Sequence, residues 1–180
     1  NMVYLDGTRN PYFGRPYLKT ADAGTGRGLV LLIHGYNNDY ADALRSYDAF
    51  FELQQVMAQL PDHRPLADNR VFVEVYWPGD ADWGIASFLF YMGALANARV
   101  SAQRFALAIA ALSQRNEPLA LEIVGHSLGC RVALELIKQL RLGGAPNINI
   151  DRVAVMAAAV PTYMLESPAD ARYLRPAYDD

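Results

Sequence analysis

One serine stands between two glycines in the stretch Gly125-His126-Ser127-Leu128-Gly129. An apolar run of strand length, residues 119–124, precedes the stretch, and apolar residues recur after it at helical spacing. A strand that ends in Gly-x-Ser-x-Gly and turns at once into a helix is typical of a nucleophile elbow, where crowding requires small residues two positions before and after the serine. The pattern predicts that the Ser127 hydroxyl is a nucleophile, with Gly125, His126 and Gly129 shaping its turn. The alternative is an ordinary strand–helix junction with two packing glycines.

A second stretch, His34-Gly35-Tyr36-Asn37-Asn38, follows another short apolar run. In acyl-transfer enzymes built this way, the loop after such a strand gives one backbone N–H to the oxyanion hole, and the residue after the nucleophile gives the other. The predicted donors are the amides of Tyr36 and Leu128, and Gly35 allows the backbone to approach the substrate closely. We interpret His34 as a residue that fastens this loop by hydrogen bonds, rather than as the catalytic base.

The elements that must position these residues alternate between strand and helix along the chain. Strands are predicted at 29–33, 70–77, 119–124 and 152–159, and helices at 40–60, 84–115 and 127–142, with a short helix at 169–178. Residues 3–5 suit a short edge strand, and the Gly-, Pro- and Arg-containing segment after them is predicted to be irregular. Such alternation favours one α/β domain over residues 1–180, with a mostly parallel sheet covered by helices on both faces.

Three stretches together resemble the α/β-hydrolase superfamily, and more narrowly an uncharacterised bacterial branch of it with a domain of unknown function. They are Ile33-His34-Gly35-Tyr36-Asn37, Val75-Tyr76-Trp77-Pro78-Gly79 and Gly125-His126-Ser127-Leu128-Gly129. The resemblance spans residues 28–165. It implies a three-layer α/β-hydrolase-like sandwich and a hydrolase-type site, and it implies no particular substrate.

An uncharged, largely apolar segment at residues 85–98 has two interpretations. It is shorter than the roughly 20 residues that cross a bilayer, so no membrane span is expected. It could pack on the sheet as an ordinary helix, or it could form an apolar wall over the substrate pocket. Ligands of open α/β sheets bind at the carboxyl ends of the strands. In the second interpretation Trp77, Trp83 and Tyr91 line the pocket, and the substrate is a small ester or acyl compound of apolar character.

Charge and cysteine content exclude some function classes. The formal net charge is −3 and the sequence has no basic run, which argues against nucleic acid as a partner. Cys130 is the only cysteine, so the chain can form no internal disulfide. We interpret Cys130 as a small buried helix residue, and its isolation is consistent with the cytoplasmic location that we expect. The sequence predicts no metal site and no cofactor.

The partners of a serine nucleophile are missing from the expected places. In α/β hydrolases the chain order is nucleophile, acid, histidine, yet no histidine follows Ser127. His126 adjoins the nucleophile on a tight turn, where its ring points elsewhere, and His63 lies in a predicted surface loop. The downstream carboxylates Glu166 and Asp170 do not stand at a strand tip.

Three explanations of this gap stay open. The chain could be a fragment that lacks the last strands together with the acid and the base. A partner or another subunit could supply the histidine, or the fold could be kept as a non-catalytic binding or interaction module. An exposed sheet edge after residue 160 would favour a homo-oligomer or a partner in the last two cases. The leading hypothesis is serine hydrolysis of a carboxylic ester or thioester through an acyl-enzyme at Ser127.

Overall fold

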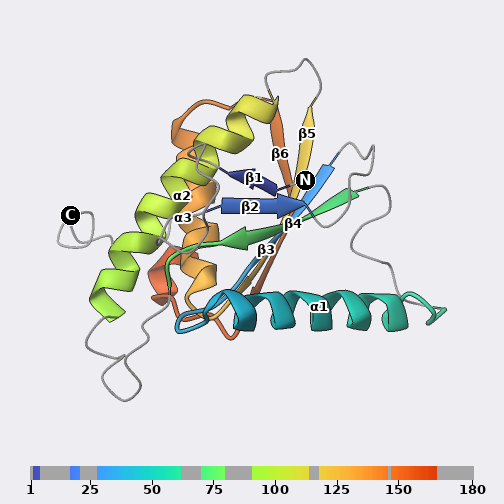
Figure 1. Ribbon diagram of the computed structural model, residues 1–180. Coiled ribbons are helices and arrows are strands. Elements are labelled where there is room, and N and C mark those ends of the chain that lie inside the picture. The colour runs from blue at the N-terminus through green and yellow to red at the C-terminus, as the bar shows by residue number, and fades with distance from the viewer. Residues whose placement is uncertain are drawn as a thin grey trace.

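The computed structural model describes residues 2–4, 17–20, 28–61, 70–79, 91–113, 118–145 and 147–165. Its elements follow one another along the chain as strands and helices in near-regular alternation (Figure 1). They are β1 (Met2–Tyr4), β2 (Tyr17–Thr20), β3 (Gly28–Ile33), α1 (Tyr40–Met57), β4 (Arg70–Tyr76), α2 (Tyr91–Ser113), β5 (Leu119–His126), α3 (Gly129–Leu142), β6 (Ile148–Met156) and a 3₁₀ turn at Thr162–Leu165.

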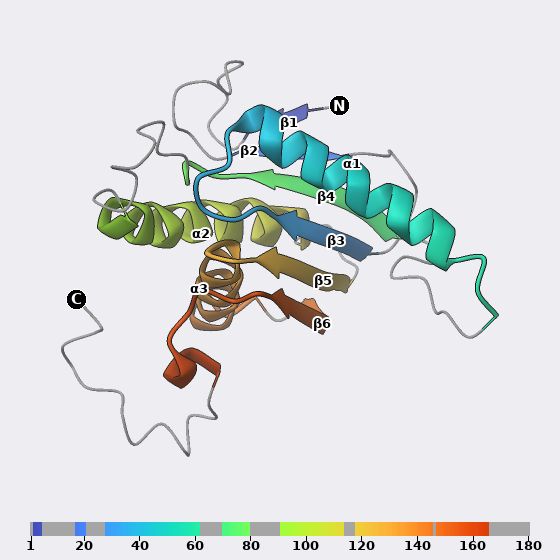
Figure 2. The same ribbon diagram turned by 90° about the horizontal axis from the view of Figure 1, so that it is seen from below.

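The strands form one sheet in the order β1-β2-β4-β3-β5-β6. β4, β3, β5 and β6 are parallel to one another, and β1 and β2 are antiparallel additions at one edge. Helix α1 covers one face of the sheet, and α2 and α3 cover the other (Figure 2). The predicted α/β fold with a mostly parallel sheet and helices on both faces is therefore confirmed.

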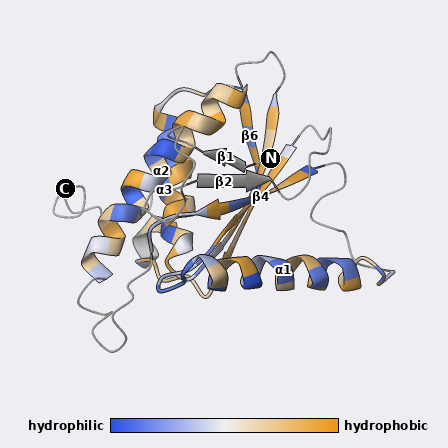
Figure 3. Ribbon diagram, viewed as in Figure 1, coloured by the Kyte–Doolittle hydropathy of each residue, from blue (hydrophilic) through white to orange (hydrophobic). Residues whose placement is uncertain are grey.

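The burial of β3 explains why its sequence is continuously apolar. Leu31 and Ile33 face the α2–α3 side and belong to the larger core cluster. Val30 and Leu32 face α1 and belong to a smaller cluster. A strand buried on both faces cannot alternate apolar with polar residues, as an exposed strand does. In Figure 3 the parallel strands are mostly hydrophobic, whereas α1 alternates between hydrophilic and hydrophobic residues.

Local signals place the ends of the helices well. Asp39 is the N-cap of α1, and its carboxylate accepts a hydrogen bond from the Asp42 amide at 2.7 Å. Asn37 lies in the turn before it with a φ of +59°. At the end of α3, Gly143 is the C-cap and Gly144 follows with a φ of +59°, a conformation that glycine adopts without strain.

Two strand predictions were wrong in part. β6 runs from Ile148 to Met156, not from 152 to 159, because its pairing with β5 begins at Leu119 and ends at His126. The supposedly irregular segment after the first strand contains β2, whose residues pair with β4, Leu18 opposite Val75. The predicted helix at 169–178 lies outside the described residues, as do residues 85–90 of the uncharged segment and His63.

Candidate active site

Ser127 lies in a tight turn between β5 and α3. Its φ is +51°. This left-handed conformation is unfavourable in free energy for any L-residue that has a side chain. The end of β6 supports this turn, because the Ser127 amide donates to the Met156 carbonyl at 2.9 Å and the Ala159 amide donates to the Ser127 carbonyl at 3.1 Å. The strained serine is thus held by a neighbouring strand rather than by its own segment alone.

The glycines around Ser127 are required by close approaches of the backbone. A Cβ on Gly125 would lie 3.0 Å from the Cα of Cys130, where α3 begins. A Cβ on Gly129 would collide with the carbonyl oxygen of His34. A Cβ on Gly35 would lie 3.0 Å from both the Cβ of Ser127 and the Nδ1 of His126. The loop after β3 and the turn after β5, ninety residues apart in sequence, are therefore in van der Waals contact.

The first amides of α3 stand beside Ser127. Among the described residues, none accepts a hydrogen bond from the Leu128 amide, although the Leu128 side chain is fully buried. By contrast, the Cys130 amide is paired, because it donates a hydrogen bond to the Ser127 carbonyl at 3.1 Å. Unpaired amides at a helix N-terminus favour negative charge. This end of α3 has the electrostatic character that an oxyanion needs.

The loop that carries Tyr36 is held at both ends. The Asn37 amide donates to the Gly79 carbonyl at 2.7 Å, and the His34 amide donates to the Tyr47 hydroxyl at 2.9 Å. The Tyr36 ring is half-buried and meets the Tyr91 ring edge to face, with centroids 5.6 Å apart. The loop is accordingly an ordered part of the site.

His34 is a buried neutral histidine. Its side chain accepts a hydrogen bond from the Trp77 amide at Nε2, at 3.3 Å, and its Nδ1 lies 2.9 Å from the Gly35 carbonyl oxygen. Desolvation by burial lowers the pKa of His34 to about 4, and the two backbone hydrogen bonds oppose that effect. Because both ring nitrogens are engaged by backbone groups, His34 is not positioned to take a proton from Ser127.

His126 is exposed and lies on the α1 side of the sheet. It borders an apolar cavity of about 220 Å³ between α1 and the ends of β3, β5 and β6. The other residues that line this cavity are Leu32, Ile33, His34, Asn38, Ser46, Tyr47, Phe50, Val124 and Met156. Within the described parts of the chain, His34 and His126 are the histidines near Ser127, and no carboxylate is hydrogen-bonded to either ring.

The residues expected to line a substrate pocket have different surroundings. The Trp77 side chain is only 4 % exposed and belongs to the core, so it forms no open wall. Its ring stacks on that of His34, with centroids 5.7 Å apart and an interplanar angle of 21°. Tyr91 is half-buried at the start of α2, beside Tyr36. Trp83 lies outside the described residues.

Tyr47 was not predicted to contribute to the site, and Trp77 was predicted with a different role. The Tyr47 hydroxyl, on α1, accepts from the His34 amide and donates to the Val75 carbonyl at 2.6 Å. The Trp77 indole N–H donates to the His34 carbonyl at 2.9 Å. Tyr47 stands in an amphipathic helix where a tyrosine gives no signal of its own. The position of Trp77 after a strand indicates a residue that lines the substrate pocket. The sequence cannot show that its ring turns into the core instead.

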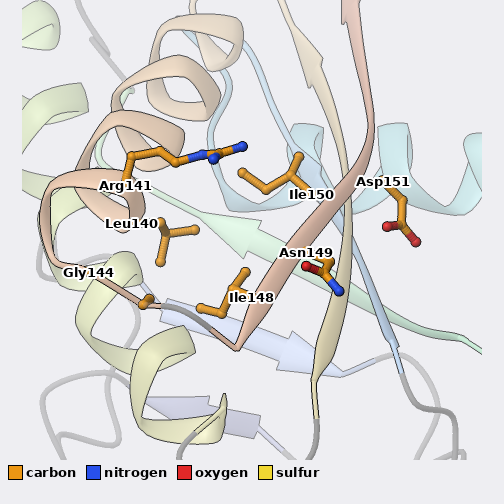
Figure 4. Close-up of a pocket in the computed structure, with 8 residues that line it drawn as sticks. Leu140, Arg141, Gly144, Ile148, Asn149, Ile150 and Asp151 are labelled. Atoms are coloured by element: carbon orange, nitrogen blue, oxygen red, sulfur yellow. The ribbon is translucent and has the colours of Figure 1, made fainter.

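A larger hollow, of about 580 Å³, lies at the opposite end of β5 and β6 from Ser127. It opens between the end of α3 and the start of β6 (Figure 4), and its lining residues are Leu140, Arg141, Gly144, Ala145, Ile148, Asn149, Ile150 and Asp151. Nearby, the buried carboxylate of Glu122 lies 3.6 Å from Arg70, which also pairs with Asp151 at 2.6 Å. Arg70 therefore bridges these two carboxylates.

Among the helices in the described parts of the chain, none combines the length and the apolar character that crossing a bilayer demands.

Cys130 is buried in α3, its thiol donates to the Gly125 carbonyl at 3.1 Å, and burial raises the pKa of that thiol. Both features are those of a packing residue rather than a nucleophile.

Comparison with known proteins agrees with this architecture. The model of one protein family, described as an alpha/beta hydrolase of unknown function (DUF900), matches residues 18–170. Neither the curated proteins nor the solved structures compared with the chain gave a match. The matched range runs from β2 past β6 and includes the histidine–glycine loop, the Trp-Pro stretch and the serine turn. The chain therefore belongs to the DUF900 family of α/β hydrolases.

Proposed function

We propose that the protein is a serine hydrolase that cleaves a carboxylic ester or thioester through an acyl-enzyme at Ser127. The Ser127 oxygen attacks the carbonyl carbon, and the carbonyl electron pair moves onto oxygen. The amides of Tyr36 and Leu128 hold this oxyanion. A base takes the proton of the Ser127 hydroxyl during the attack and gives it to the alcohol or thiol that leaves as the C–O or C–S bond breaks. Water then attacks the acyl-enzyme in the same way, which releases the acid and returns the proton to Ser127.

The positive φ of Ser127 carries the proposal. A packing serine at a strand–helix junction has no need of a conformation that costs about 1–2 kcal/mol, and glycine would serve better there. Strain of this kind clusters at functional sites, where the surrounding structure enforces it. Here the enforcing contacts are those from Met156 and Ala159. Membership of an α/β-hydrolase family supports the same reaction class.

The proton acceptor is a separate part of the proposal. His34 is neutral, buried and bonded at both nitrogens, and the His126 ring lies beside Gly35 on the α1 side. We therefore assign neither as the base, and place the histidine and acid of the triad outside the described residues. An apolar acyl group suits the half-buried Tyr36–Tyr91 pair next to the serine turn.

A fluorophosphonate probe tests the proposal directly. Attack by Ser127 forms an O–P bond, breaks the P–F bond and releases fluoride and a proton, so peptide mapping finds the phosphonyl group on Ser127. The Ser127→Ala variant should not be labelled, whereas Ser46→Ala, which changes an exposed serine of α1, should be labelled like the parent.

Intact, folded protein that is never labelled at Ser127 would refute the hydrolase and favour the non-catalytic binding module. A panel of p-nitrophenyl esters of graded chain length then measures the acyl preference. A rate that rises from acetate to longer chains is expected for an apolar acyl site.

A further inference from the structure

The loop that presents the Tyr36 amide is fastened mainly by the segment after β4, residues 77–79. Three hydrogen bonds join them. The Trp77 indole N–H donates to the His34 carbonyl at 2.9 Å, the Trp77 amide donates to His34 Nε2 at 3.3 Å, and the Gly79 carbonyl accepts from the Asn37 amide at 2.7 Å. These bonds bracket Gly35 and Tyr36 on both sides.

The indole bond has a particular place among them. The His34 carbonyl that it reaches belongs to the peptide between His34 and Gly35, so the bond fixes the orientation of that peptide. The next peptide, between Gly35 and Tyr36, carries the Tyr36 amide. The same carbonyl oxygen lies against Gly129, where a Cβ would collide with it. The carbonyl is thus held between the Trp77 indole and the first turn of α3, whose N-cap residue is Leu128.

The segment 77–79 is shaped to keep the indole in this position. The Gly79 amide donates to the Trp77 carbonyl at 2.8 Å, which folds the chain back over Pro78. A Cβ on Gly79 would lie 2.6 Å from the Trp77 ring. The stacking of the ring on His34 completes its enclosure. Trp77 therefore has one buried orientation, with its N–H directed at the loop.

From this geometry we infer that Trp77 is a positioning residue that aligns the Tyr36 amide with the serine turn, and that it acts on the chemical step rather than on substrate binding. The inference rests on the proposed hydrolase function. Trp77 itself touches no substrate, since its side chain is in the core. Loss of an oxyanion donor slows catalysis by about 10²–10³, and a displaced donor retains part of its effect. We expect a loss of about 10- to 100-fold.

The test is the phosphonylation of Ser127 as a function of fluorophosphonate concentration, which separates the limiting rate from the half-saturating concentration. Trp77→Phe removes the N–H and keeps an aromatic ring. It should lower the limiting rate about 10- to 100-fold and leave half-saturation unchanged. Phe105→Leu removes volume from the same core cluster, far from the loop along α2. It should lower the melting temperature and leave the limiting rate as in the parent.

A second pair of variants covers the case in which Trp77→Phe does not fold. Gly79→Ala keeps the indole N–H, but the added Cβ would lie 2.6 Å from the Trp77 ring, so the ring and the loop must shift relative to each other. This variant should reduce the limiting rate in the same way. Gly93→Ala is its control, because nothing lies within 4 Å of a Cβ added there.

The outcomes separate the two proposals. Parent protein that is not labelled at Ser127 refutes the hydrolase itself. If the parent protein is labelled but Trp77→Phe or Gly79→Ala has the same limiting rate as its control variant, the positioning role of Trp77 is overturned. The hydrolase proposal is then unaffected.

Discussion

The protonation state of His34 offers a sharp check on the site. Its Nε2 accepts a hydrogen bond from the Trp77 amide, and its Nδ1 faces the Gly35 carbonyl, which can only accept. Both contacts are satisfied at once by the neutral ring with its proton on Nδ1. Added protons must therefore break the bond at Nε2 and place a charge in a site that is 5 % exposed.

The sign and size of the pH effect follow from the pKa. The pKa of His34 is about 4 in the folded protein, against an ordinary value of 6.5. Between pH 4 and 6.5 the His34 ring is protonated in the unfolded chain and neutral in the native state. The free energy of unfolding therefore falls as the pH is lowered from 6.5 to 4, and this contribution changes no further below 4. A difference of this size corresponds to about 3 kcal/mol.

Urea unfolding of the parent and of His34→Gln at several pH values between 4 and 8 isolates this contribution, because carboxylates titrate alike in both proteins. Between pH 7.5 and 4 the parent should lose about 3 kcal/mol more than the variant. Long-range ¹H–¹⁵N spectra of the parent should show His34 as the Nδ1–H tautomer at pH 7, still neutral at pH 5.5. A His34 ring that titrates near pH 6.5, or that carries its proton on Nε2, would refute the hydrogen-bonding scheme of the loop.

Three further substitutions test the packing of the site, each by urea unfolding. Ser127→Gly should raise the free energy of unfolding by about 1 kcal/mol, because it relieves the strain of φ +51°, while labelling is lost; a destabilised variant would contradict the strain. Tyr47→Phe should cost about 1–3 kcal/mol, since the buried His34 amide and Val75 carbonyl lose their shared partner; an unchanged stability would mean that water replaces the hydroxyl. Gly129→Ala should cost about 1–3 kcal/mol through its clash with the His34 carbonyl, and a neutral result would show that the loop can retreat from α3.

Much of the site was readable from short stretches of sequence. A tight turn between a strand and a helix needs small residues at fixed offsets, and Gly125 and Gly129 stand at those offsets. The N-cap Asp39 and the helix end at Gly143 follow from hydrogen bonds and backbone conformations that extend over only a few residues. For the same reason the buried run of β3 and the helices α1 and α3 were found close to their observed bounds.

Other features depend on partners far along the chain, which no local pattern reveals. β2 exists because it pairs with β4, and β6 has the bounds that its pairing with β5 dictates. The place of His34 beside Gly35 indicates a residue that fastens the loop, but its partners Tyr47 and Trp77 lie 13 and 43 residues away.

The sequence by itself therefore determined which serine stands in the turn, which loop faces it, and the α/β fold that brings them together, because each of these has a steric requirement written within a few residues. Only the tertiary structure decided that Trp77 is a buried donor rather than a pocket wall, and that His34 is neutral with both nitrogens engaged. The orientation of a side chain and the solvation of a ring are set by neighbours from several elements, and those neighbours meet only when the sheet has formed.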